Sequence, residues 1–192
     1  MVLTSSKMLP LGQRAPDFTL LDVISEDNLT LQDVQSDIAT VVMFLCNHCP
    51  YVKHIQDVLV PLTSTYIQKG ITFVAVNSND VEEYPEDRPQ EMQRLAEKLD
   101  FPFPYLFDET QKVARDYGAT CTPDFFVFDR SLRCVYRGQF DESRRGNHQP
   151  VTGSDLSEAL DCILKGTPIN PDQHPSIGCN IKWKREALSS LS

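Results

Sequence analysis

The 192-residue chain lacks a long apolar run: the longest, residues 40–46, is far shorter than the ~18 residues of a membrane span. Residues 1–11 lack the continuous apolar stretch of ~7–15 residues that a secretory signal requires. Positive charge is also scarce, since 18 Lys and Arg face 27 Asp and Glu for a net charge of −9. These absences predict a soluble, cytoplasmic protein and argue against nucleic acid and membrane as partners.

The chain also lacks internal repeats and a second apolar core, so a single domain over residues 1–192 is expected. Continuous β-rich runs are typical of strands buried on both faces and stand at residues 41–45 and 71–76. Further strands are expected in a hairpin within 11–31, at 105–107, and at 125–128 paired with 133–136. Helical spacing predicts helices over 52–69, 90–99, 110–117 and 155–164, the last capped by Ser154. The pattern indicates an α/β fold, a central mixed β-sheet flanked by helices, with a C-terminal tail, 167–192, that wraps the surface.

Six cysteines are the most informative feature: Cys46, Cys49, Cys121, Cys134, Cys162 and Cys179. A chain of this size folds without disulfides, and structural disulfides are rare in the cytosol, so metal binding and redox chemistry are the two options. Only one closely spaced pair of cysteines exists, whereas structural zinc sites usually have two ligand pairs. We therefore expect no metal and no cofactor.

Cys49 stands where a buried strand ends and a helix begins. Pro50 suits the first helical turn and disfavours a helical conformation at the residue before it, so Cys49 is predicted to be the N-cap. The positive end of the helix dipole favours a thiolate there, and a thiolate is the reactive form. A buried, inert cysteine is the alternative. The neighbouring His48 either supports the thiolate or lines the entrance to the site.

A second motif is Thr122-Pro123, which directly precedes a predicted strand. A proline is tolerated at a strand start, and X–Pro bonds are the ones that adopt the cis form. Alone, this signal is weak. Its pairing with the earlier strand–Cys–Pro–helix segment makes it informative.

These motifs together resemble the thioredoxin superfamily, and specifically its peroxiredoxin-like branch. The resemblance is carried by Gly12-Gln-Arg-Ala-Pro-Asp-Phe18, Asn47-His-Cys-Pro-Tyr-Val52, Thr120-Cys-Thr-Pro-Asp-Phe-Phe126 and Ser176-Ile-Gly-Cys-Asn-Ile-Lys-Trp183. It implies a thioredoxin-like fold in which a cis-proline loop, Thr122 and Pro123, faces the reactive Cys49. Two departures stand out. Cys46 occupies the position of the peroxide-binding Thr or Ser, and Cys121-Thr122-Pro123 replaces the active-site arginine. Arg144 is a substitute for that cation or a surface arginine.

The resemblance implies an enzyme that reduces hydroperoxides through Cys49, with a second cysteine that resolves the intermediate and a thioredoxin-type or small-thiol electron donor. Cys121 is the first expected partner because it lies two residues before Pro123; Cys46 is the second and Cys179, in the tail, the third. Cys134 and Cys162 lie at core-like positions. A reductase or isomerase of protein disulfides and a non-catalytic redox-sensing module are the alternatives. Related folds commonly form homodimers.

Overall fold

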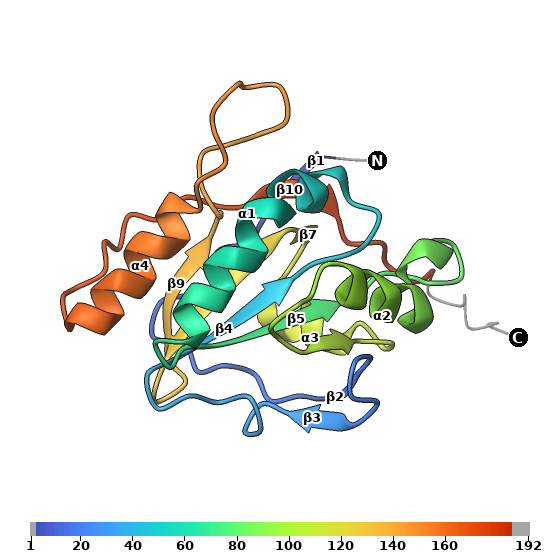
Figure 1. Cartoon of the computed structure of the whole chain (residues 1–192), viewed down its shortest axis with the longest axis horizontal. Coiled ribbons are helices and arrows are strands. Elements are labelled where there is room, and N and C mark those ends of the chain that lie inside the picture. Colours follow the sequence, from blue (N-terminus) through green and yellow to red (C-terminus); the bar gives the residue numbers. More distant parts are fainter. Residues whose placement is uncertain (1–2, 186–192) are drawn as a thin grey trace, which may run out of the picture.

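A computed structural model describes residues 3–185 of the chain (Figure 1). No helix in that range is both long and apolar enough to cross a membrane. The described residues form five helices: α1 (Pro50–Ile67), the short 3₁₀ helix η1 (Pro85–Asp87), α2 (Pro89–Lys98), α3 (Lys112–Tyr117) and α4 (Ser154–Lys165).

A seven-stranded mixed sheet forms the centre of the molecule. Its strands, in spatial order, are β3 (Asn28–Thr30), β2 (Thr19–Asp22), β6 (Tyr105–Phe107), β5 (Thr72–Asn77), β4 (Ala39–Phe44), β8 (Asp124–Asp129) and β9 (Cys134–Gly138). The central strands β4, β5 and β6 are parallel, and β8 joins β4 antiparallel. The predicted hairpin, buried strands and antiparallel pair are therefore all present, within two or three residues of their expected ends.

Two hydrophobic clusters, one on each face of the sheet, hold these layers together. In β4, Val41 and Met43 face the cluster that α1, α2 and α4 cover, whereas Val42 and Phe44 face the cluster under α3 and the N-terminal segment. Because side chains alternate along a strand, a fully buried strand needs apolar residues at consecutive positions. This requirement explains the continuous apolar runs of β4 and β5.

The predicted tail, of which residues 186–192 lie outside the described residues, contains a strand that the sequence did not predict. Within it, β10 (Ile177–Asn180) pairs with β1 (Leu3–Ser5) and with the short β7 (Cys121–Thr122), forming a separate three-stranded sheet. Figure 1 shows this sheet next to the N-terminal end of α1. Pairing between strands that lie so far apart in the sequence leaves no local signal. The tail also contains prolines and only a brief apolar segment, a pattern that does not predict a strand.

The predicted cap of α4 is also corrected. Ser154 is the first helical residue, and the N-cap is Gly153 with φ 66°. The side chain of Phe140 would lie 2.6 Å from a Cβ at this glycine. The left-handed backbone and this close contact together favour glycine over serine at the cap position.

Gly178 determines how closely β10 approaches β7. A Cβ atom at this position would lie 2.0 Å from the Thr122 carbonyl oxygen, and the backbone there does not have a positive φ. We expect Gly178→Ala to displace β10, to lower stability by about 1–3 kcal/mol as overpacking does, and to accelerate alkylation of Cys49. The measurement is chemical unfolding together with iodoacetamide kinetics. Ile177→Ala, at a partly exposed position of the same strand, is the control. Unchanged stability and alkylation in Gly178→Ala would contradict the close contact.

Candidate active site

Cys49 lies at the junction of the sheet and α1, as the sequence predicts. It is the N-cap of α1, with φ −65° and ψ 119°, and Pro50 is the first helical residue. Extended backbone at the N-cap is what a following proline imposes. The Cys49 side chain has no exposed surface, because β7 and β10 lie over it. The sulfur is therefore held at the positive end of a helix and away from bulk water.

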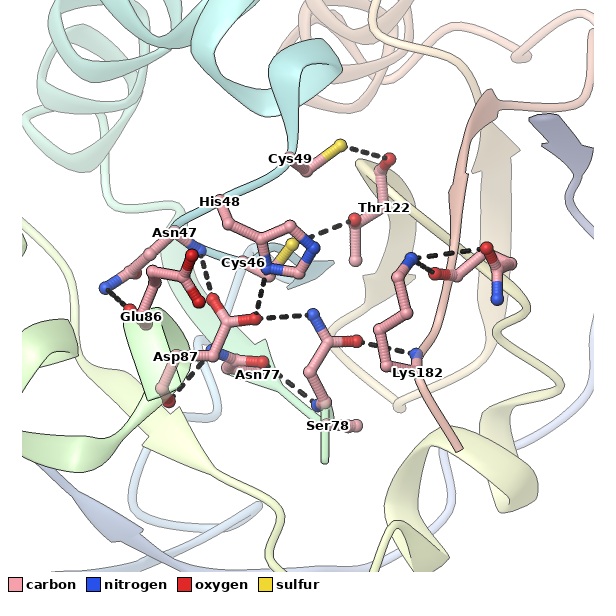
Figure 2. A network of polar contacts seen from close by, with 12 residues as sticks. Cys46, Asn47, His48, Cys49, Asn77, Ser78, Glu86, Asp87, Thr122 and Lys182 are labelled. Atoms are coloured by element: carbon pink, nitrogen blue, oxygen red, sulfur yellow. Dashed lines mark hydrogen bonds and ion pairs between the residues drawn. The ribbon is translucent and has the colours of Figure 1, made fainter. Parts of the chain in front are cut away.

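Thr122 contacts both cysteines of the Cys46-x-x-Cys49 motif. The Cys49 sulfur lies 3.3 Å from the Thr122 carbonyl oxygen, to which it donates when protonated, and the Cys46 sulfur lies 3.3 Å from the Thr122 hydroxyl (Figure 2). The peptide bond between Thr122 and Pro123 is cis. The loop that precedes β8 thus packs directly against the cysteine pair.

The surroundings of Cys49 favour its thiolate. The hydrogen bond from the Cys46 thiol has the largest effect and lowers the pKa of Cys49 to about 5, against ~8.5 for a free thiol. Burial opposes this shift, whereas hydrogen bonds from Cys179 and Thr122 support it. The Cys49 side chain makes no capping hydrogen bond of good geometry, but the Val52 backbone N–H also stabilises the thiolate electrostatically. A pKa of about 5 favours the thiolate of Cys49 at neutral pH, and the thiolate is the reactive form of a cysteine.

The two thiols that support Cys49 have the opposite character. Burial, the hydrogen bond to Cys49 and the charge of Asp87 raise the pKa of Cys46 well above its ordinary value. Burial and the hydrogen bond to Cys49 raise the pKa of Cys179 to about 12. Both remain protonated at neutral pH and can donate to the Cys49 thiolate. One nucleophile with two neutral thiols beside it is an arrangement suited to disulfide formation at Cys49.

Cys121, the first expected partner, has a different environment. Its sulfur approaches the carbonyl oxygens of Ser176, at 3.9 Å, and Pro123, at 4.0 Å, and no hydrogen bond between its thiol and Cys49 is present. Neighbouring residues of a strand point to opposite sides. Since the Thr122 side chain contacts Cys46, the Cys121 side chain points the other way. The sequence spacing correctly placed the β7 backbone beside Cys49 but did not indicate which side chain faces it.

His48 belongs to a polar network that the sequence did not indicate. Its Nδ1 lies 2.6 Å from Asp87 Oδ2, and its ring stacks on Tyr84 with ring centroids 5.0 Å apart. Asp87, at the end of η1, also accepts the Asn47 backbone N–H at 2.7 Å and the Asn79 amide at 2.8 Å (Figure 2). Burial raises the pKa of Asp87, but these hydrogen bonds outweigh it and hold the pKa below its ordinary value. Asp87 is a fixed, buried carboxylate beside the cysteines.

The network reaches the tail through Asn79. The Asn79 side-chain oxygen accepts the backbone N–H of Lys182 at 2.8 Å, and the Lys182 carbonyl oxygen accepts the Gln111 amide at 2.7 Å. Cys46, His48 and Asp87 place one sulfur, one nitrogen and one oxygen within 4.8 Å of each other. Both carboxylate oxygens of Asp87 already accept hydrogen bonds, so we interpret this group as a hydrogen-bonded network and assign no metal to it.

Arg144 is held by its own loop. Its guanidinium donates to the carbonyl oxygens of Asp141 and Ser143, each at 2.7 Å, and to the side chain of Gln139. It lines a narrow pocket together with Pro123 and Tyr51. These hydrogen bonds use Nη1 and Nη2 and none involves Cys49, whereas Arg144 Nε is buried and has no partner among the described residues. Of the two remaining cysteines, Cys134 is buried in β9 and Cys162 is partly exposed on α4.

Asp124, the residue after Pro123, is a buried acid. Burial raises its pKa to about 8, although hydrogen bonds partly oppose the shift. Its Oδ1 accepts the Phe125 backbone N–H at 3.2 Å, whereas Oδ2 has no partner among the described residues. An unpaired carboxylate oxygen in the interior is costly, so the neutral acid is favoured there.

Three solved structures are similar to this chain over most of its length. A thioredoxin-family thiol:disulfide interchange protein of Chlorobium tepidum TLS aligns over 82% of this chain and 99% of its own, with a TM-score of 0.60 and 18% identity. An uncharacterised conserved protein of Geobacillus kaustophilus is 57% identical, with a TM-score of 0.96 over 97% of this chain and 99% of its own. A hypothetical protein of Sinorhizobium meliloti 1021 is 44% identical, with a TM-score of 0.91 over 94% and 98%. No functionally curated protein matches the chain.

The chain therefore has a thioredoxin-like fold, as the sequence motifs predicted. The model of the AhpC/TSA family matches residues 11–137, which include both cysteines of the Cys46-x-x-Cys49 motif, Thr122 and Pro123. The protein belongs to the AhpC/TSA family, which confirms the thioredoxin-superfamily resemblance.

Removal of the Cys46 thiol tests the largest single contribution to the lowered pKa of Cys49. We expect Cys46→Ala to raise the pKa of Cys49 from about 5 towards its ordinary value, because the thiolate loses its strongest hydrogen-bond donor. The pKa is read from thiolate absorbance near ~240 nm and from the pH dependence of alkylation. Cys134→Ala, in β9, removes a buried thiol elsewhere and is the control. An unchanged midpoint in Cys46→Ala would contradict this account of the low pKa.

The buried acid predicts a pH-dependent stability. The pKa of Asp124 is about 8 in the folded protein and ~3.9 in an unfolded chain. Its contribution to stability is fully present below pH ~4 and is lost as the pH rises to about 8. We expect Asp124→Asn to remove this dependence, so that the variant gains stability relative to wild type as the pH rises across that window. Denaturant unfolding at pH 4.5 and 7.5 measures the difference, and an equal difference at both pH values would contradict the raised pKa.

Proposed function

We propose that this protein is a thiol–disulfide oxidoreductase in which Cys49 attacks a substrate disulfide and Cys46 resolves the mixed disulfide. The observation that carries the proposal is the contrast between the two sulfurs. The pKa of the buried Cys49 is lowered to about 5, the pKa of Cys46 is raised well above its ordinary value, and both sulfurs contact Thr122. Disulfide exchange needs one ionised nucleophile and one thiol positioned to attack it in turn.

The reaction has two steps. In the first, the Cys49 thiolate bonds to one sulfur of the substrate disulfide, and the other sulfur leaves as a thiolate. In the second, Cys46 loses its proton and attacks the Cys49 sulfur, which releases the remaining substrate thiolate and leaves a Cys46–Cys49 disulfide. Two electrons pass from the cysteine pair to the substrate. A thioredoxin-type or small-thiol donor then reduces the pair, and we propose the reducing cytoplasm as its setting.

We prefer Cys46 as the resolving cysteine because of its contacts and its position in the chain. Its thiol has the larger hydrogen-bonding effect on Cys49, ahead of the thiol of Cys179. It also lies on the same short loop, so the two sulfurs can meet without separation of β10 from β7. Cys121 is disfavoured because its thiol approaches backbone carbonyl oxygens and not the nucleophile.

Disulfide mapping tests the assignment. After one equivalent of 5,5′-dithiobis(2-nitrobenzoate), we expect a Cys46–Cys49 disulfide in the wild type and in the matched controls Cys121→Ser and Cys134→Ser. We expect Cys46→Ser to stop at a mixed disulfide on Cys49, and Cys49→Ser to react at least about 100-fold more slowly. A Cys49–Cys179 disulfide in the wild type would transfer the resolving role to β10. Oxidation spread over all six cysteines would refute the proposal.

Peroxide reduction is the second candidate, and one observation favours it. The Cys49 side chain has no exposed surface, so a small peroxide reaches it with less rearrangement than a protein disulfide does. The thiolate would attack one peroxide oxygen to give a sulfenic acid and an alcohol, and a neighbouring thiol would condense with the sulfenic acid to release water. It ranks second because the peroxide-binding Thr or Ser is replaced by Cys46 and because Arg144 is engaged in its own loop. Stopped-flow oxidation of Cys49 that is faster with hydrogen peroxide than with a small disulfide would reverse the order.

A further inference from the structure

The second step of the proposed reaction requires a base. Cys46 must give up a proton before it attacks the mixed disulfide, yet burial and the nearby Asp87 charge strongly favour its neutral form. In the reduced protein the negative Cys49 sulfur is available to interact with the Cys46 S–H. Once Cys49 is bonded to the substrate sulfur, that acceptor no longer exists. The Cys46 proton then needs another destination within the buried site.

We propose that His48 accepts this proton and that Asp87 positions His48 for the purpose, an inference that rests on the proposed function. The Nδ1 atom of His48 lies 2.6 Å from the Asp87 carboxylate. A carboxylate acceptor at that distance holds a proton on Nδ1, so in the neutral ring Nε2 carries the free lone pair. Nε2 is buried and has no hydrogen-bond partner among residues 3–185.

The His48 ring lies near Cys46, the thiol that must lose its proton. A ring nitrogen of His48 and the Cys46 sulfur are within 4.8 Å of each other, and Figure 2 shows the imidazole beside that sulfur with Asp87 bound to its Nδ1. Stacking on Tyr84, with an interplanar angle of 14°, fixes the plane of the ring. The Asp87 carboxylate is fixed in turn by the Asn47 backbone N–H and by the Asn79 amide. Ring orientation is thus set from both sides.

The charges balance during the transfer. As the S–H bond of Cys46 breaks and an N–H bond forms on His48, the sulfur becomes negative and the ring positive. The new imidazolium lies between two negative groups, the Cys46 thiolate and the Asp87 carboxylate. Other titratable groups near the ring have their own partners: Tyr105 donates to Asn47 at 3.0 Å, and the Lys182 ammonium donates to Asn180 while facing Tyr84. His48 is therefore a partly buried base whose Nε2 is buried and unpartnered among the described residues, with its ring next to Cys46.

The two steps of the reaction can be timed separately with 5,5′-dithiobis(2-nitrobenzoate). The first nitrothiobenzoate ion reports attack by Cys49, and the second reports attack by Cys46. We expect His48→Gln to leave the first release within about twofold of wild type and to slow the second by about 100-fold at neutral pH, as loss of a general base does. Asp87→Asn should slow the second release by about 10-fold or more, through loss of ring orientation. His54→Gln, on α1 with its ring near Ser143, is the control.

The pH profile separates proton transfer from a merely structural role. In the wild type we expect the second release to become independent of pH in the neutral range. In His48→Gln it should rise about tenfold per pH unit, because Cys46 must then ionise unaided. A folded His48→Gln or Asp87→Asn variant with the wild-type rate and pH profile would overturn the inference. If a Cys46→Ser variant still releases the second ion at the wild-type rate, the proposed function fails at its resolving step, and the role of His48 fails with it.

Discussion

The close placement of Cys46, Cys49 and Thr122 is the constraint on which the site depends. Donation from the Cys46 thiol is the largest influence on Cys49, and it places one negative charge on the sulfur at the start of α1. The helix end alone offers only partial charges, and burial opposes ionisation. The neutral thiols of Cys46 and Cys179 therefore substitute for the cation that a buried thiolate would otherwise require. The low pKa of Cys49 thus has causes other than a neighbouring arginine.

The sequence was informative wherever structure follows from neighbouring residues. A continuous apolar run before Cys49-Pro50 is sufficient to predict a buried strand and a helix that starts after Cys49, because burial and proline geometry act locally. The environment of His48 could not be predicted in this way. Asp87 lies in a polar loop with Glu82, Glu83 and Glu86, where nothing in the composition distinguishes a buried carboxylate from exposed ones. Its role follows from the folding of η1 against the residues after β4.

The same limit applies to Cys179 and Cys121. Spacing from Pro123 correctly indicated that β7 lies near Cys49, but the face occupied by each side chain depends on strand alternation and on the pairing of β10. That pairing depends on Gly178, whose missing side chain allows backbone contact with Thr122. A glycine in a tail with several prolines gives no indication of this from sequence. The ranking of the candidate resolving cysteines therefore depends on tertiary packing, which the sequence does not show.

The small sheet formed by β1, β7 and β10 has a consequence for biosynthesis. Its strands come from both ends of the chain and from the middle, so it can close only after the ribosome has released residues 177–180. Cys49 is translated long before them. A nascent chain therefore passes through an interval in which the helix start exists but its cover does not. Until β10 pairs with β7, Cys49 lacks part of the backbone that covers it in the folded protein.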